Sequence, residues 1–250
     1  MTSSSTGAAR RFFIEGTGAA GNVIEIGGSD AHKIAHVLRL SVGDRVEIID
    51  STASEFDAAI ETIGRSVRVT LLGKRDVRQT TPASLWVDVA QAVPKGSRMD
   101  FVVEKGTELG ARAFVPFFCE RAIGRGVGEE KIARWRRLAR TASQQSGRRD
   151  VPQISHPLSY DALLSTFDNY DVVLFAWELA PPQALREALL SALPERGEVL
   201  AVIGPEGGFT HAEASAAFER GAVAVSLGRR ILRTDTAAMA LLAVIGALAS

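Results

Sequence analysis

From Pro82 onward, the chain alternates short apolar stretches with longer amphipathic ones, and this alternation constrains its fold more than any other feature. Parallel strands need a long crossover between them, usually a helix, so the pattern predicts a parallel sheet with helices on both faces. The predicted strands are Leu85–Ala92, Ala113–Phe118, Asp171–Trp177, Glu198–Ile203 and Ala222–Leu227. The predicted helices are Met99–Leu109, Glu129–Ser143, Pro182–Leu193, His211–Arg220 and Asp235–Leu248. The fold class is therefore α/β, and ligands are expected outside the carboxyl ends of the strands.

The first third of the chain follows a different pattern, with short β-rich stretches, turns and a single helix. Its predicted strands are Arg11–Ile14, Val23–Ile26, Arg45–Ile49, Glu55–Ile60 and Ser66–Leu72. The helix is expected over about Asp30–Leu40, with Ser29 or Asp30 as its N-cap. These elements predict a small β-barrel. The predicted division is a flexible tail over residues 1–9, the barrel domain over 10–78 and the α/β domain over 79–250.

The composition excludes several protein classes. Hydrophobic residues make up 46% of the chain and charged residues 23%, a globular balance that is not typical of disordered or fibrous proteins. The single cysteine, Cys119, excludes an intramolecular disulfide and argues against a structural zinc site. The longest uncharged apolar run, Ala237–Ala249, is shorter than the roughly 20 residues that span a bilayer. With no secretory signal pattern in Met1–Ala9, a cytoplasmic protein without a membrane helix is expected.

Charge is unevenly distributed, although the formal net charge is zero. Residues 79–150 contain 13 basic and 8 acidic side chains, whereas residues 151–250 contain 6 and 11. The segment Lys131–Arg149 contains seven basic residues and no acidic one, and helical periodicity turns its arginines away from an apolar stripe. This face is predicted to attract phosphates, with an ordinary solvated helix face as the alternative.

The segment Gly16–Gly21 matches the dinucleotide-binding fingerprint G-x-G-x-x-G. That fingerprint requires a helix directly after the glycines, but the following residues, Asn22–Ile26, are typical of a strand. A hairpin turn is therefore predicted in place of a nucleotide site.

His32 and His36 are four residues apart on the predicted helix, a spacing that places two imidazoles on one face. In zinc peptidases a glutamate follows the first histidine, but here that position is Lys33. A helix surface or an RNA contact is therefore preferred to a metal site.

Two loops that follow predicted strands are the best candidates for a ligand site. Gly204–Thr210 contains three glycines, which let the backbone approach a ligand closely, and it lacks the Gly-Lys-Ser/Thr ending of a P-loop. In Leu227–Thr236, Ile231 and Leu232 suit the faces of a flat heterocycle, and Arg233 suits an anion. Thr234 or Asp235 is predicted to cap the final helix. Connecting loops without a ligand remain the alternative for both segments.

Five segments together resemble the RsmE-type ribosomal RNA methyltransferases of the SPOUT class. They are His36–Arg39, Glu104–Gly110, Gln145–Arg148, Gly204–Gly208 and Leu227–Thr236, and the resemblance covers nearly the whole chain after about Arg10. It implies a PUA-like N-terminal β-barrel, a C-terminal SPOUT α/β domain with a deep trefoil knot, a homodimer, and S-adenosylmethionine as the methyl donor. Two positions depart mildly from the family pattern, where Arg229 replaces a proline and Asp235 a glutamate.

The resemblance further implies methylation of uracil N3 at a specific uridine of 16S ribosomal RNA in the small subunit, with no metal. Arg233 would stabilise the imide anion, and Glu206 would accept the proton or only hold its loop. The expected cofactor-binding residues are Gly204, Pro205, Glu206, Gly207, Gly208, Leu227, Gly228, Ile231, Leu232 and Arg233. The expected RNA-binding residues are Arg39, Arg136, Arg137, Arg140 and Arg148. A ribose methyltransferase of the same fold and a noncatalytic RNA-binding module are the alternatives.

Overall fold

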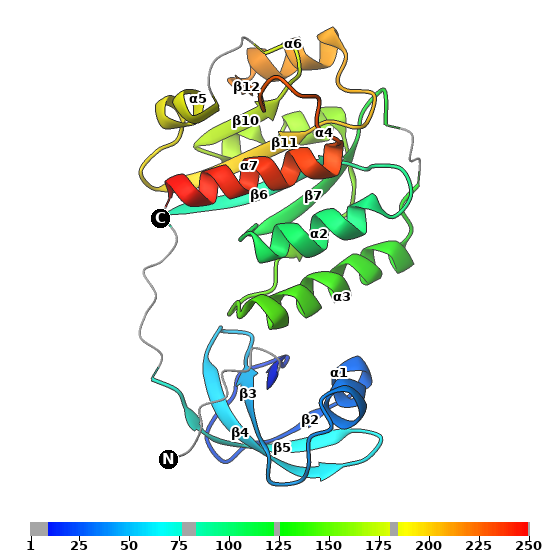
Figure 1. Ribbon diagram of the computed structural model, residues 1–250, viewed down its shortest axis with the longest axis vertical. Helices are drawn as coiled ribbons and strands as arrows, with labels where there is room; N and C mark the ends of the chain where they lie inside the picture. Colours follow the sequence, from blue (N-terminus) through cyan, green and yellow to red (C-terminus); the bar gives the residue numbers. More distant parts are fainter. Residues whose placement is uncertain (1–9, 77–83, 123–125, 181–184, 250) are drawn as a thin grey trace. The chain divides into compact units, whose positions relative to one another are not determined.

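The computed structural model describes residues 10–76, 84–122, 126–180 and 185–249, which form two compact units (Figure 1). Met1–Thr80 and Arg140–Asp150 make up the first unit, and Thr81–Ala139 and Val151–Ser250 make up the second. The tail predicted over residues 1–9 and the boundary predicted after residue 78 lie outside the described residues. No helix in the described ranges is long and apolar enough to cross a membrane.

The first unit is built on a five-stranded sheet in the order β1-β3-β4-β5-β2. Its strands are β1 (Arg11–Phe13), β2 (Val23–Ile26), β3 (Arg45–Ile49), β4 (Glu55–Ile63) and β5 (Val67–Lys74). β1 pairs in parallel with β3, and the other neighbours are antiparallel. In β5, Val67, Val69 and Leu71 are buried and alternate with more exposed residues, as period-2 patterning requires. All five predicted strands are confirmed, whereas closure of the sheet into a barrel stays a prediction, because no pairing among the described residues joins β1 to β2.

The segment Gly16–Gly21 is a loop that leads into the strand β2 and not into a helix, as expected from the sequence. The predicted hairpin is wrong, because β1 and β2, which the loop connects, pair with β3 and β5 and lie at opposite ends of the strand order. Gly18 is required by packing, since a Cβ atom there would lie 2.8 Å from Leu71 Cδ1. Its backbone N–H donates to the buried Asp50 carboxylate at 3.0 Å, which anchors the loop to the end of β3.

The helix of the first unit differs from its prediction. It consists of α1 (Gly28–His32) followed by the π-helical segment η2 (Lys33–Val37), and its N-cap is Gly27, which has no side-chain cap. The predicted cap at Ser29 or Asp30 is wrong because the Asp30 carboxylate accepts hydrogen bonds from Arg140 and from Gln144 Nε2 at 3.1 Å. The same contacts explain why residues 140–150 belong with the first unit.

The second unit contains a seven-stranded sheet in which all pairings are parallel. Its order is β12-β10-β11-β6-β7-β8, with β9 also pairing with β7. The strands are β6 (Leu85–Ala92), β7 (Ala113–Phe118), β8 (Gln153–Ile154), β9 (Leu158–Ser159), β10 (Val172–Ala176), β11 (Gly197–Ile203) and β12 (Val223–Val225). The five predicted strands are confirmed, and β8 and β9 were missed because two residues are too few to show a period.

Helices cover both faces of this sheet, as predicted. The helices of the second unit are α2 (Arg98–Glu108), α3 (Glu129–Ser146), α4 (Tyr160–Leu164), η3 (Phe167–Asn169), α5 (Leu185–Ala192), α6 (His211–Glu219) and α7 (Thr234–Leu248), the end of α3 lying in the first unit. One apolar cluster joins one face of the sheet to α2, α3, α5 and α7, and a second joins the other face to α4 and α6 (Figure 1). Trp135 and Ile132 of the predicted stripe on α3 are buried in the first cluster.

A buried carboxylate in the middle of β6 is neutralised by a bidentate arginine. Arg112 Nε and Nη2 donate to Asp88 Oδ1 and Oδ2 at 2.7 and 2.8 Å, and Tyr170 donates its hydroxyl to Oδ2 at 2.9 Å. The hydrogen bonds that Arg112 donates to Asp88 and Glu198 raise its pKa, and burial raises the pKa of Tyr170. Breaking a buried ion pair by removing one partner leaves an uncompensated charge, which is more costly than losing a surface pair.

Arg112→Met is therefore expected to lower the free energy of unfolding by about 3 kcal/mol, because Asp88 would stay buried without its cation. Urea denaturation followed by circular dichroism measures this change. The matched control is Arg134→Met, which removes an arginine that is 61% exposed from its pair with Asp100 and is expected to cost less than about 1 kcal/mol. Equal losses of unfolding free energy in the two variants would contradict the conclusion that Arg112 neutralises a buried carboxylate.

Candidate functional site

A cavity of about 510 Å³ lies at the carboxyl ends of β10, β11 and β12. Its walls come from three loops, namely residues 176–178, 203–209 and 226–233, together with the start of α7. Since the strands are parallel, their carboxyl ends meet at one edge of the sheet, and segments far apart in the sequence become neighbours there. The candidate ligand site is this cavity.

The structure brings together every residue that the sequence analysis assigned to the cofactor. Gly204, Pro205, Glu206, Gly207, Gly208, Leu227, Gly228, Ile231, Leu232 and Arg233 all line the cavity. Their role as cofactor-binding residues stays a prediction. Ile231, which was expected to enclose a heterocycle, is 94% exposed in this structure, whereas Leu232 is partly buried.

Close contacts with neighbouring side chains explain why two positions of the loop after β11 are glycines. A Cβ atom at Gly204 would lie 2.8 Å from the ring of Phe209, which packs on Phe175 beneath the loop. Gly208 has a φ of +66°, and a Cβ atom there would lie 2.5 Å from Glu178 Oε1. The loop therefore exposes main chain to the cavity in a conformation that other residues would strain.

A hydroxyl fixes the start of α7 to this loop. Thr234 Oγ1 donates to the carbonyl oxygen of Gly204 at 2.5 Å and accepts a hydrogen bond from Gln91 Nε2 at 2.8 Å. The prediction that Thr234 or Asp235 caps α7 is wrong, because the N-cap is Arg233 and the Thr234 hydroxyl is already used. Gln91 was missed, although a fully buried amide at the end of an apolar strand is a signal for such a link.

Glu206 is held by an ion pair. Its Oε1 accepts hydrogen bonds from Arg98 Nη1 at 2.6 Å and from the backbone N–H of Lys95 at 3.1 Å. The two contacts tie the loop after β11 to the segment that leads into α2. Of the two roles that the sequence left open for Glu206, this geometry favours holding the loop. Arg98 was missed because nothing in its surroundings marks it as a partner of a residue more than a hundred positions away.

Glu178 is a second carboxylate of the cavity that the sequence analysis missed. It follows β10, lines the cavity and is exposed, and its Oε1 lies against the backbone of Gly208. Among the described residues, no hydrogen bond or ion pair involves its side chain. A single glutamate after a strand has no motif spacing, so only the fold reveals its position.

The arginines predicted to bind RNA are mostly engaged inside the protein. Arg136 Nη2 donates to the carbonyl oxygen of Ile154 at 3.2 Å, Arg140 contacts Asp30 and the carbonyl oxygen of Phe13, and Arg148 pairs with Asp150 at 2.6 Å. Arg136, Arg140 and Arg148 therefore have intramolecular contacts, and their binding to RNA stays a prediction.

Two of the predicted RNA-binding residues are exposed and have no such partner in the described part of the chain. Arg137 lies on the solvent side of α3, and Arg39 follows η2 with a φ of +50°, a strained conformation for a residue with a side chain. Their contact with RNA stays a prediction.

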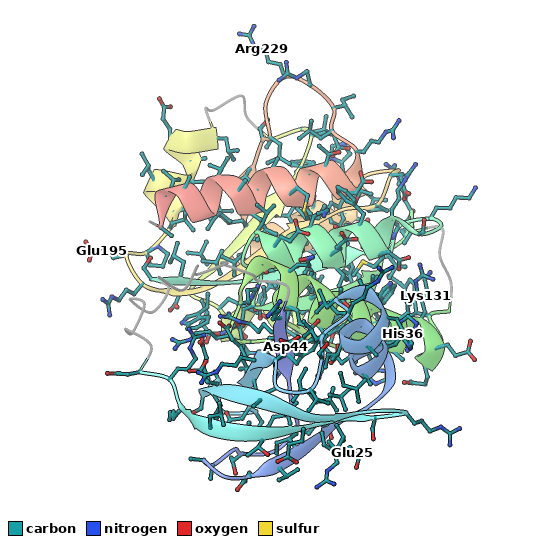
Figure 2. All side chains as sticks on the ribbon, turned by 60° about the horizontal axis from the view of Figure 1, so that its bottom comes forward. Glu25, His36, Asp44, Lys131, Glu195 and Arg229 are labelled. Carbon is teal, nitrogen blue, oxygen red and sulfur yellow. The ribbon has the colours of Figure 1, made fainter. Side chains whose placement is uncertain are left out.

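Exposed cations also lie on the cavity itself. Arg229, Arg230 and Arg233 line it and are exposed, and within the described ranges none of them forms a hydrogen bond or ion pair through its side chain. Figure 2 shows Arg229 extending away from the ribbon into solvent. This loop therefore presents three unneutralised charges at the mouth of the cavity.

Among the described residues, no third metal-ligating side chain joins the histidine pair. The rings of His32 and His36 are 4.8 Å apart and both residues are exposed. The part of the chain that the structure describes contains no group of three or more His, Cys, Asp or Glu side chains that could hold a metal ion.

Comparison with known proteins shows matches to both units. Residues 81–246 match a family described as the RNA methyltransferase domain, and residues 26–72 match one described as the RNA methyltransferase PUA domain. The second match confirms the PUA-like character predicted for the first domain.

Curated relatives named Ribosomal RNA small subunit methyltransferase E align over most of the chain. The Bacillus subtilis protein is 32% identical over 237 residues, which cover 91% of this chain and 92% of the relative. The Mycobacterium bovis protein is 30% identical over 243 residues, which cover 96% and 92%.

Two solved structures are similar to this one. The Ribosomal RNA small subunit methyltransferase E of Neisseria gonorrhoeae, bound to S-adenosyl methionine, is 27% identical with a TM-score of 0.80 and coverage of 96% of this chain and 97% of that one. A methyltransferase of Legionella pneumophila in complex with the same cofactor is 28% identical with a TM-score of 0.86 and the same coverage.

Thr234→Val is expected to lower the free energy of unfolding by about 1–3 kcal/mol, because the partly buried Gly204 carbonyl and the buried Gln91 amide would each lose a partner. Thermal and urea denaturation measure the loss. Thr236→Val, an exposed change two residues further along α7, is the control and is expected to change stability by less than about 0.5 kcal/mol. If both variants were equally stable, the hydroxyl link would not hold the loop.

Proposed function

This chain belongs to the RNA methyltransferase family, and on that premise we propose that it transfers a methyl group from S-adenosylmethionine to uracil N3 of a specific uridine in 16S ribosomal RNA of the small subunit. The observation that carries the proposal is the glycine-lined cavity at the carboxyl ends of β10, β11 and β12, in a chain that aligns almost end to end with relatives of this name. Such an RNA is a cytoplasmic substrate, which favours the same location for the enzyme.

The residues of the cavity fit the proposed donor. Gly204 and Gly208 line the cavity, and a side chain at either position would push Phe209 or Glu178 out of place. The residues that would hold the donor are the backbone of Gly204, Gly207, Gly208, Leu227 and Gly228 and the side chains of Ile231 and Leu232. When bound, S-adenosylmethionine supplies a methyl group already activated by its sulfonium, so no metal is needed.

The protein's task is then to stabilise the nucleophile. Uracil N3 carries a proton that would pass to solvent water at the mouth of the cavity before N3 attacks the methyl group. Its departure leaves negative charge on the imide, which a preorganised cation stabilises. Arg233 is suited to this role, because it lines the cavity, has no intramolecular partner among the described residues and lies at the N-terminus of α7, where the helix dipole adds positive potential. Glu206 would act as a positioning residue that holds the donor loop through Arg98.

We propose the SPOUT topology, with the C-terminal segment forming a deep trefoil knot, and a homodimer. In support of the knot, the chain leaves β12 at the edge of the sheet, lines the cavity through residues 226–233 and then packs α7 on β11 and β6, so it crosses back over its own strands. Exposed Phe101 on α2 and the neighbouring Leu109 provide apolar surface that a second copy could cover.

We propose that RNA is bound at the mouth of the cavity by Arg229 and Arg230, and that Arg137 on α3 and Arg39 in the first unit each contact RNA on their own unit. Contacts with the phosphate backbone contribute most of the affinity for RNA. An arginine without an intramolecular carboxylate partner binds phosphate without first breaking an ion pair. The target base has to leave its stack to reach the cavity, and flanking phosphates would then lie near this loop.

The proposed reaction is tested by identifying the methylated nucleoside. Wild-type protein, labelled S-adenosylmethionine and small ribosomal subunits lacking the modification are expected to yield label in 3-methyluridine after nuclease digestion and mass spectrometry. Arg233→Ala is expected to lower kcat at saturating donor at least about 100-fold, because the lost cation acts on the imide anion. Arg220→Ala removes an exposed arginine that follows α6 and does not line the cavity, so it is the control and is expected to keep the wild-type rate. Label in a ribose would contradict the proposed atom, and full activity of Arg233→Ala would contradict the role of Arg233.

The proposed RNA contact at the mouth of the cavity is tested by reversing its charges. Arg229→Glu with Arg230→Glu is expected to weaken subunit binding and to flatten its dependence on salt concentration, since each lost phosphate contact lowers the slope by about 0.7–0.9. Filter binding across a salt series measures both quantities, and the melting temperature of the double variant checks its fold. Arg137→Glu tests the helix face separately. A slope that falls only in Arg137→Glu would place the RNA on α3 and contradict the loop as its contact.

A further inference from the structure

The charged side chains that line the cavity are two carboxylates and three guanidinium groups. They are Glu178, Glu206, Arg229, Arg230 and Arg233. Glu206 is neutralised by Arg98 at 2.6 Å, and the three arginines carry positive charge at the mouth. In the described part of the chain, Glu178 is the cavity carboxylate whose side chain has no hydrogen bond and no ion pair.

Glu178 is held in place by the strand that precedes it. β10 lies between β11 and β12 in the sheet, and the N–H of Trp177 extends the pairing by donating to the carbonyl oxygen of Val225 at 3.1 Å. A turn then follows, closed by the N–H of Ala180 on the carbonyl oxygen of Trp177 at 3.1 Å. The carboxylate is therefore presented from a rigid strand end, and Gly208 provides the room that its Oε1 occupies.

We propose that Glu178 is the anionic group that pairs with the positive charge of the methyl donor. The assignment rests on the function proposed above. S-adenosylmethionine carries two cationic groups, the sulfonium and the α-ammonium, and one anionic group, the α-carboxylate. The arginines of the same cavity would attract the carboxylate and repel the two cations. A carboxylate that the protein itself does not neutralise, placed against the glycine loop that would hold the donor, is the group that compensates this repulsion.

This role makes Glu178 a specificity-determining residue. A neutral adenine nucleoside cannot form an ion pair with the carboxylate, whereas a cationic one gains a charge-assisted contact. The carboxylate would therefore select a charged donor from among adenine nucleosides of similar shape, which the glycine loop by itself cannot distinguish.

Isothermal titration calorimetry with two ligands tests the proposal. S-adenosylmethionine contains both cationic groups, and 5′-methylthioadenosine is a neutral nucleoside that shares its adenosine and lacks both. Glu178→Gln keeps the shape of the side chain and removes its charge, so it is expected to bind S-adenosylmethionine about tenfold more weakly and 5′-methylthioadenosine within twofold of wild type. Glu219→Gln, an exposed change on α6, is the control, and the melting temperature of each variant checks its fold.

Equal losses for both ligands would overturn the proposal, because the carboxylate would then act on the shared adenosine or on the loop. Unchanged affinity for S-adenosylmethionine in Glu178→Gln would overturn it as well. Wild-type protein that binds neither ligand would contradict the proposed function itself and the assignment with it, whereas normal wild-type binding combined with an insensitive Glu178→Gln variant would contradict the assignment alone.

Discussion

Parallel pairing of β6, β10, β11 and β12 is the constraint on which the rest of the second unit depends. It brings the carboxyl ends of β10, β11 and β12 to one edge, so loops from distant parts of the sequence surround one cavity. Parallel strands buried on both faces also require helices above and below, which the two apolar clusters provide. The cavity is thus a consequence of the parallel direction and the order of these strands. The glycines of its loops determine how closely a ligand can approach the main chain.

Polar links then hold the edge in one conformation. The Thr234 hydroxyl joins the loop after β11 to the start of α7 and, through Gln91, to β6, while the Glu206–Arg98 pair joins the same loop to α2. Both links close on the loop that carries Gly204 and Gly208, so the main chain facing the cavity is supported from two sides. A site organised before its ligand arrives loses less entropy on binding than a loose one.

Most of the fold could be predicted from the sequence because long strands and helices have clear periods. β6 and β7 begin and end where the apolar runs do, and Trp135 and Ile132 are buried as the 3.6-residue period of α3 requires. The failures have local causes. β8 and β9 are too short to have a period, and Asp30 is not a cap because Arg140 and Gln144, more than a hundred residues away, take its carboxylate. A cap depends on what else competes for the side chain, which adjacent residues do not reveal.

The same limit applies to charge at the site. The sequence shows how many arginines α3 and the loop after β12 contain, but it does not show which of them the protein neutralises. Arg140 is engaged by Asp30, whereas Arg229 and Arg230 have no such partner among the described residues. The two glutamates of the cavity differ in the same way. Glu206, which lies in the glycine motif, is paired with Arg98, whereas Glu178, which lies in no motif, has no such partner among the described residues. Motifs identified the loops of the site, since the glycines that a loop needs are neighbours in sequence. The charges available to a ligand are those left over after tertiary pairing, so they follow from the fold and not from the motif.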